Sequence, residues 1–203
     1  KVVGIYLLPG STAPNGYVAT IPGIYNPIRN FGTLSSSADN HAAALVLDAV
    51  LEVCQDWPED ALAGISQELI ASEILANWDR THRIDSVGGH VFYEFWRVMR
   101  STPNMWVTPF DPADPVNTPR DLNLDDPSVV TAVQNALTAA VVALNTAGIP
   151  LDRPWGEVQF VEKNGERIPI HGGSGDMMFS VITSNLVEGE GFSSIRHGNS
   201  YIQ

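Results

Sequence analysis

Residues 155–170 read WGEVQFVEKNGERIPI, and here the spacing of apolar residues changes from a helical to a strand-like period. The pair Asn164-Gly165 favours a two-residue type I′ turn, because both residues tolerate positive φ. Val158 and Phe160 before that turn, and Ile168 and Ile170 after it, stand two positions apart, and Arg167 precedes Ile168 in the same alternating stretch. The stretch therefore predicts a β-hairpin.

The sequence after the hairpin predicts further strands. A glycine loop, HGGSGD at residues 171–176, is followed by strand-like residues 178–185 and an acidic EGEG loop. We expect the glycine loop to be flexible or to face a substrate. The last residues, HGNSYIQ at 197–203, read as the start of another strand. We therefore expect the sequence to be a piece of a longer chain.

The sequence before the hairpin predicts helices. Asp39 or Asn40 is placed to cap the first helix, Ser66 to cap the second, and Pro127 and Gly148 mark the ends of the clearest one. We expect helices at residues 40–57, 66–78, 90–100 and about 125–148.

The chain divides into three parts of different character. Residues 1–38 are dense in proline and glycine and predict an irregular segment with short strands. Residues 39–148 predict a helical lobe, and residues 149–203 the hairpin and sheet strands. The predicted fold class is therefore α+β, with a helical lobe followed by antiparallel strands.

Five prolines between residues 102 and 126 predict an irregular stretch that wraps the surface. Trp106 and Phe110 are its expected anchors. The other tryptophans are expected in the core or at interfaces. They are Trp57, Trp78, Trp96 and Trp155.

The composition excludes several classes of partner. Among 203 residues, 11 basic and 23 acidic side chains give a formal charge of −12, which disfavours nucleic acid and anionic membrane surfaces. No apolar run approaches the ~20 residues that span a bilayer, and no signal peptide is evident. Cys54 is the single cysteine, so no internal disulfide can form, and we expect it to be buried.

The loop GGSGD superficially resembles a nucleophile elbow. That motif needs glycines two residues before and after the serine. Gly172 precedes Ser174, but Asp176 follows it. An elbow is therefore not expected.

Two histidines beside glycines could act as general bases near neutral pH. His171 and His197 have this setting, although hydrogen-bonding structural roles are more common for such residues. A triad of Ser200, His197 and Asp176 can be written down, but nothing in the spacing supports it.

Metal and phosphate sites are not predicted. His90 and Glu94 lie four residues apart, but a zinc site needs three or four ligands, so a surface pair is expected. An aspartate-rich stretch does not fit a calcium loop. Its members are Asp111, Asp114, Asp121, Asp125 and Asp126. The two common phosphate-binding motifs, GxxxxGK[ST] and GxGxxG, do not occur in the sequence.

Three segments resemble penicillin-acylase-type N-terminal nucleophile hydrolases, in the branch of acyl-homoserine-lactone, aculeacin and cephalosporin acylases. They are IPLDRPWGEVQFVEKNGERIPIHGGSGD, RHGNSYIQ and, upstream, LANWDRTHRIDSVGGHVFYEFWRVM. WVTPFDPADPVNTPRDL and DDPSVVTAVQNAL agree with the same family. The resemblance covers about residues 40–203 and implies part of a β-subunit within a four-layer αββα sandwich.

The resemblance implies an amidohydrolase that cleaves N-acyl compounds such as β-lactam side chains, acyl-homoserine lactones or lipopeptides. In that family a precursor cleaves itself, and a serine, threonine or cysteine at the start of the β-chain attacks the amide. The α-amino group, with a pKa near ~8, serves as the base. No cofactor or metal is implied. Quorum quenching, antibiotic biosynthesis and a periplasmic or secreted location follow from the family.

The family's nucleophile is not present in this chain, which begins at Lys1. Neither Asn26 nor Asn30 matches the oxyanion asparagine. Gln203 matches a glutamate that supports the histidine behind the nucleophile, so its implied role is orientation. His171 and His197 match structural positions.

The resemblance implies three partners: the rest of the β-subunit, an α-subunit from the same precursor and a small N-acyl substrate. Two alternatives remain open from the sequence. One is a non-catalytic α+β binding module, and the other is a self-contained serine hydrolase.

Overall fold

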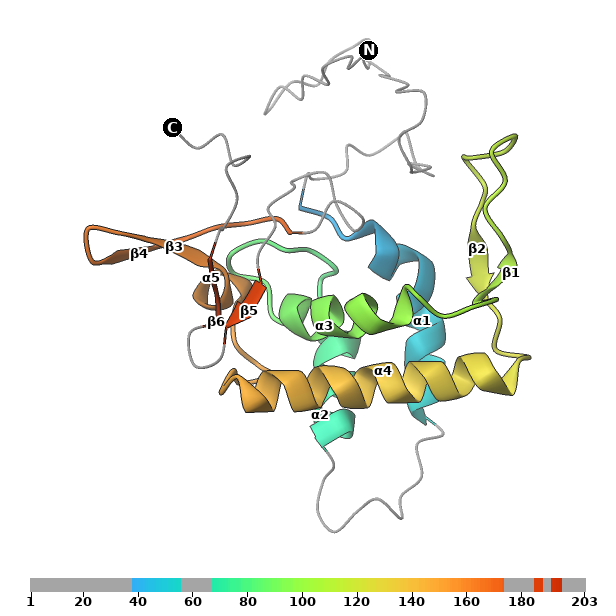
Figure 1. The fold of residues 1–203 in the computed structure, drawn as a ribbon, viewed down its shortest axis with the longest axis horizontal. Coiled ribbons are helices and arrows are strands. Elements are labelled where there is room, and N and C mark those ends of the chain that lie inside the picture. The colour runs from blue at the N-terminus through green and yellow to red at the C-terminus, as the bar shows by residue number, and fades with distance from the viewer. Residues whose placement is uncertain (1–37, 56–66, 174–184, 188–190, 195–203) are drawn as a thin grey trace.

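The computed structural model describes residues 38–55, 67–173, 185–187 and 191–194. They form an α+β structure of helices and short antiparallel strand pairs, as the sequence predicts (Figure 1). One strand pair lies between the third and fourth helices, and the other pairs follow the fourth helix. The expected irregular segment at residues 1–38 lies almost entirely outside the described part.

Four helices build the lobe. Figure 1 shows α3 lying along α4, with α1 and α2 crossing behind them, and α4 contacts all three of the others. Their buried apolar faces form one continuous core. The helices are α1 (His41–Gln55), α2 (Gln67–Asn77), α3 (Gly89–Met99) and α4 (Pro127–Thr146).

Local signals set the ends of these helices. The Asn40 side chain accepts a hydrogen bond of 2.8 Å from the Ala43 amide, so Asn40 is the cap of α1. Pro127 occupies the first turn of α4, and Gly148 follows that helix with φ +68°. These predictions are confirmed. The expected cap of α2, Ser66, lies outside the described residues.

The core helix α4 corrects one expectation. It has 20 residues and is apolar enough, by length and composition, to cross a membrane, although no such run was expected. Its buried side chains pack against the other helices of the lobe, as the core helix of a folded domain does. They are Val129, Val133, Ala136, Leu137, Ala140, Val141 and Leu144.

The proline-rich stretch is more regular than predicted. It contains β1 (Trp106–Thr108) and β2 (Arg120–Leu122), which pair in antiparallel fashion with Trp106 opposite Leu122. Trp106 is half-buried against the core, as an anchor should be. Phe110 is 38% exposed, so it is less buried than was expected of an anchor.

The predicted hairpin is confirmed, but its start is helical. Residues Trp155–Val158 form the single turn α5, and strands β3 (Phe160–Lys163) and β4 (Glu166–Pro169) follow. Asn164 and Gly165 have φ values of 56° and 79°, as a type I′ turn requires.

Two further strands pair beyond the hairpin. They are β5 (Asn185–Val187) and β6 (Gly191–Ser194), and they are antiparallel. Residues 178–184 of the expected strand lie outside the described part of the chain.

Most of the side chains that were expected in the core are buried. Trp78, Trp96 and Trp155 are buried, and Trp57 lies outside the described residues. Cys54 is buried too, and burial raises the pKa of its thiol to about 11.

Candidate functional site

Residues 80–87, here called the connector, link the helical lobe to the β part through main-chain hydrogen bonds. On the lobe side, the Asn40 amide donates to the Arg80 carbonyl at 2.8 Å. The His82 amide donates to the Ala38 carbonyl at the same distance. This isolated β-bridge holds the connector beside the start of α1.

Three main-chain donors approach the other side of the connector. The close approach excludes a side chain at Gly156, where a Cβ would lie 2.8 Å from the Ile84 Cβ and 2.9 Å from the Pro169 Cβ. The connector therefore fastens both parts of the chain together. The donors are the Trp155 amide to Ser86, the Gly156 amide to Ile84 and the Gly172 amide to His82, at 2.8, 2.9 and 2.9 Å.

The contacts of the connector with the start of α1 on one side, and with Trp155, Gly156 and Gly172 on the other, are here called the junction. His82 lies at its centre and is fully buried. Its Nε2 lies 3.1 Å from the Gly89 carbonyl oxygen, so Nε2 carries the proton. The rings of Trp155 and Trp78 meet it edge-on, with centroids 4.4 and 5.5 Å away. Burial lowers the pKa of His82 to about 3, which keeps the ring neutral.

His90 and Glu94 correct the expectation of a surface pair, because both side chains are buried. His90 Nε2 lies 3.0 Å from the Pro150 carbonyl oxygen, and burial lowers the pKa of His90 to about 4. Glu94 pairs with Arg97 at 3.0 Å. Burial raises the pKa of the Glu94 carboxyl, and Arg97 opposes that shift.

Ser86 belongs to a structural network and does not have the setting of a nucleophile. Its hydroxyl donates to an Asp79 carboxylate oxygen at 2.6 Å and accepts from the Trp78 indole N–H at 2.8 Å. The Thr81 amide donates to the same carboxylate oxygen at 3.0 Å. These contacts hold the turn between α2 and the connector.

Gly172 is held by hydrogen bonds at residues 171–173, the part of the glycine loop that the structure describes. Its carbonyl oxygen accepts hydrogen bonds from Trp155 Nε1 and Gln159 Nε2, both at 3.0 Å. Its φ of +88° favours glycine. His171 beside it is exposed.

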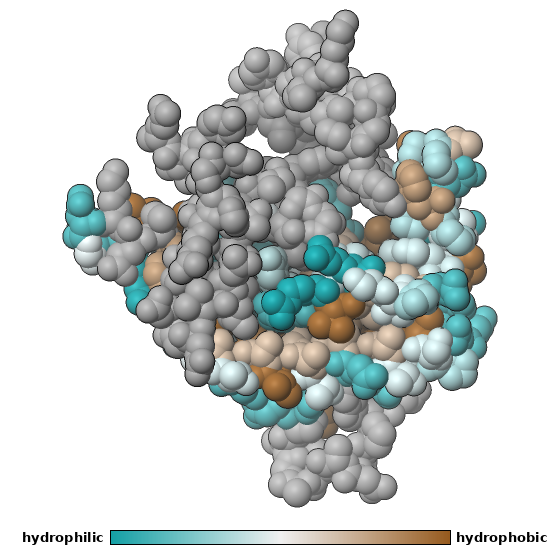
Figure 2. All heavy atoms as spheres, in the orientation of Figure 1, coloured by the Kyte–Doolittle hydropathy of each residue, from teal (hydrophilic) through white to brown (hydrophobic). Residues whose placement is uncertain are grey.

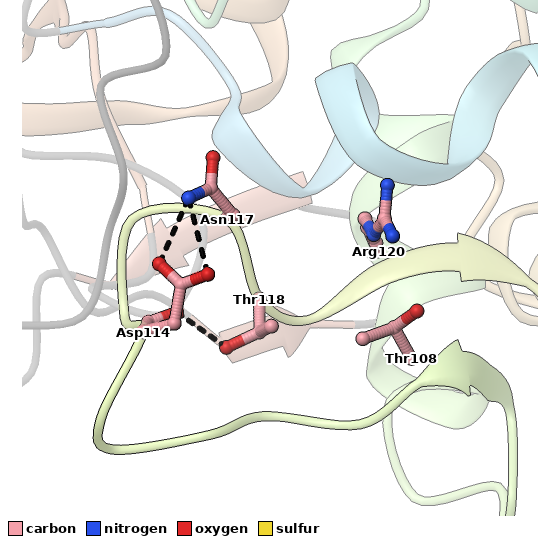
Figure 3. A pocket seen from close by; sticks show the side chains of 5 residues that line it. All are labelled: Thr108, Asp114, Asn117, Thr118 and Arg120. Carbon is pink, nitrogen blue, oxygen red and sulfur yellow. Dashed lines mark hydrogen bonds between the residues drawn. The ribbon is translucent and has the colours of Figure 1, made fainter.

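A polar cavity of about 340 Å³ lies at the loop between β1 and β2 (Figure 3). Asn117 Nδ2 donates to both carboxylate oxygens of Asp114, at 2.8 and 3.1 Å. Thr118 Oγ1 donates to the Asp114 carbonyl at 2.7 Å. Arg120 and Thr108 stand apart from these groups in Figure 3. The sequence did not predict this arrangement, because its prolines were interpreted only as breakers of regular structure.

The described residues bring no metal-ligand set together. Within ranges 38–55, 67–173, 185–187 and 191–194, no three histidine, cysteine, aspartate or glutamate side chains could hold an ion. Two aspartates of the β1–β2 loop instead accept hydrogen bonds within that loop, Asp111 from the Ala113 amide at 2.8 Å and Asp114 from Asn117.

Several candidate residues lie outside the described part, so their roles stay predictions. Gln203, the one family position carried over to a catalytic role, is among them. The others are Asn26, Asn30, Ser174, Asp176, His197 and Ser200.

Comparisons with known proteins point to one family. A family model described as penicillin amidase matches residues 28–203. The chain is 30% identical over 177 residues to acyl-homoserine lactone acylase PvdQ of Pseudomonas syringae pv. syringae (strain B728a), covering 87% of this chain and 22% of that protein. It is 33% identical over 166 residues to aculeacin-A acylase of Actinoplanes utahensis, covering 80% and 20%. The chain thus spans about a fifth of the length of the curated relatives it matches.

Proposed function

This chain belongs to the penicillin amidase family, and we propose that it is part of an amidohydrolase that cleaves the amide bond of an N-acyl compound. One observation carries the proposal: the family match extends over residues 28–203, and relatives matched over most of this chain are acylases. Because the chain spans about a fifth of those relatives, the activity is proposed for a larger protein.

The proposed reaction uses a nucleophile outside this chain. A hydroxyl or thiol at the start of a β-chain attacks the amide carbon, and the α-amine takes its proton. Backbone donors stabilise the tetrahedral oxyanion, the amine product leaves, and water releases the acid from the acyl-enzyme. Autoprocessing of a precursor would expose that nucleophile.

The interactions of the described residues support a scaffolding role for this chain. His82 and His90, both neutral, use Nε2 to donate to main-chain carbonyls. Ser86 is held by Asp79 and Trp78. Each of these groups is engaged in holding the fold, which leaves the reaction to residues elsewhere in the protein.

We assign the chain to a four-layer αββα sandwich, shared with the rest of the β-subunit and an α-subunit of the same precursor. The antiparallel strand pairs that follow α4, after a mostly helical region, support this assignment. Gln203 is proposed to orient the histidine behind the nucleophile, since an amide can accept a hydrogen bond from an imidazole. A periplasmic or secreted location is proposed from the family.

The relatives' names guide the choice of substrate class. Two matched relatives are named acyl-homoserine lactone acylase and aculeacin-A acylase. We propose an N-acyl-homoserine lactone or an acylated peptide first, and a β-lactam side chain second. Quorum quenching and a part in antibiotic metabolism are the roles that correspond to these substrates.

The test uses the whole protein that contains this chain. Purified protein is incubated with N-acyl-homoserine lactones, an acylated peptide and a β-lactam, and mass spectrometry follows the released acid and amine. Intact mass under denaturing conditions identifies the chains present. The matched control replaces the residue that begins the β-chain with alanine.

We expect equimolar acid and amine from at least one substrate, and a β-chain that begins with Ser, Thr or Cys. The alanine variant should release neither product. Reversible binding without product would favour the binding-module alternative and overturn the proposal. Turnover by the 203-residue chain alone, blocked by substituting Ser200 or Ser174, would overturn it in favour of a self-contained hydrolase.

A further inference from the structure

Residues 106–122, here called the arm, project from the helical lobe. Figure 1 shows β1 and β2 leaving the helices side by side and ending in a loop. The buried residues of the arm are Thr118, Pro119 and Leu122, and Trp106 is half-buried against the core, whereas residues 109–117 are exposed. The rest of the arm therefore presents most of its surface away from the lobe.

Large apolar side chains are concentrated on this arm. Among the described residues, seven large apolar side chains are exposed, and three of the seven are Val107, Phe110 and Val116. Val107 is 58% exposed between the half-buried Trp106 and Thr108, so it points away from the lobe. Figure 2 shows brown, hydrophobic atoms on the right-hand side of the molecule, where the arm lies. Several large apolar groups exposed on one projecting element are typical of an interaction surface.

The arm holds its shape through its own hydrogen bonds. Thr118 Oγ1 accepts from the Asp111 amide at 2.8 Å and donates to the Asp114 carbonyl at 2.7 Å. Asn117 holds the Asp114 carboxylate. A loop that is ordered before it binds loses less conformational entropy on binding. These bonds therefore suit the arm to docking as a rigid element.

Charge and chain length indicate what covers the arm. Asp111, Asp114 and Asp121 against Arg120 give the arm a net charge of −2, in a chain whose formal charge is −12. A second copy or an anionic membrane would bring like charges together. About four-fifths of the length of each matched relative lies outside its match. A larger protein of that kind would supply the covering surface.

We propose that the arm docks, through Val107 and Val116, onto the part of the same protein that lies outside this 203-residue chain. The receiving surface is apolar with a basic rim, which complements the aspartates of the arm. This inference rests on the proposed function, in which the chain is one part of a larger acylase.

The test measures cysteine labelling in the whole protein. Val107→Cys and Val116→Cys are made separately and reacted with a maleimide, in native buffer and in denaturant. Cys54 is the buried background thiol of this chain, so unsubstituted protein gives the blank. Turnover of an N-acyl substrate is measured on the same samples, which separates failure of the docking inference from failure of the proposed function.

We expect both cysteines to label at least about tenfold more slowly in the native protein than in denaturant, because docking buries them. Labelling of both within less than that factor would overturn the proposal, whether or not the samples are active. Protection that disappears when a dimer dissociates on dilution would assign the arm to a second copy. Protection that needs added anionic vesicles would assign it to a membrane. Either result would also overturn the proposal.

Discussion

Acidification is expected to destabilise the region around His82 and His90, because both rings are buried and neutral. Their pKa values are about 3 and about 4 in the folded protein, against 6.5 for an unperturbed histidine. Between those values the unfolded chain binds protons that the folded chain does not. Stability therefore rises with pH in this window and is lost as pH falls below 6.5.

The magnitude follows from these pKa values. At about pH 5 an unperturbed histidine is almost fully protonated, whereas His82 and His90 remain mostly neutral. The loss relative to neutral pH is about 2 kcal/mol for each ring, or about 4 kcal/mol for both. Nearby charges act on each ring: Asp79 raises and His90 lowers the pKa of His82, while Asp152 raises and Arg153 lowers the pKa of His90.

The assay is hydrogen exchange of the whole protein, read from peptides that cover α3 and the connector. Exchange rates at about pH 7.5 and about pH 5, corrected for intrinsic exchange, give the opening free energy. His82→Gln and His90→Gln each retain a neutral donor without a titrating ring. Each variant should lose about 2 kcal/mol of the pH dependence, whatever its stability at neutral pH.

Glu94 contributes a pH dependence of stability that is opposite in sign to that of the two histidines. Burial raises the pKa of its carboxyl, so the folded chain binds that proton more readily and gains stability as pH falls. Because Glu94 is unchanged in the histidine variants, their difference from the unsubstituted protein isolates the two rings. A pH dependence that survives intact in the double variant would refute the assignment of acid lability to these histidines.

Three further predictions concern the junction and the core. Gly156→Ala should destabilise the protein by about 1–3 kcal/mol in denaturant unfolding, because a Cβ would overlap Ile84; an unchanged midpoint would show that the two segments can separate freely. Gln159→Leu, a change of similar size, removes the donor to the Ile170 and Gly172 carbonyls and should cost about 1–3 kcal/mol in the same assay; an unchanged midpoint would contradict a stabilising role for these bonds. Cys54, buried and with its pKa raised to about 11, should resist maleimide at neutral pH until the protein is denatured; rapid labelling of native protein would contradict its burial.

Local signals predicted much of the fold. Asn164-Gly165 needs positive φ at two successive residues, and Asn40 and Pro127 act within a few residues of themselves, so the sequence alone locates these features. Strands β1 and β2 were missed because prolines between them read as breakers. The pairing of Trp106 with Leu122 joins residues on either side of that proline-rich loop.

The junction was not predictable in the same way, because its contacts join distant parts of the chain. His82 is buried between two tryptophans and bonded through its main chain to Ala38 and Gly172. His90 seemed to belong on a surface because its partner, the Pro150 carbonyl, is far away in the sequence. Helical periodicity cannot show that another segment covers a polar face.

The connector joins the two parts of the chain through main-chain atoms, and this leaves some of its side chains unconstrained. Arg83 and Asp85 point into solvent while the carbonyls beside them hold Trp155 and Gly156 in place. Mutations at those two positions can accumulate without loosening the junction, since every amino acid except proline supplies the same backbone groups. The junction can therefore persist while the residues at positions 83 and 85 change during evolution. Gly156, which faces the connector, has no room for a side chain and cannot change in the same way.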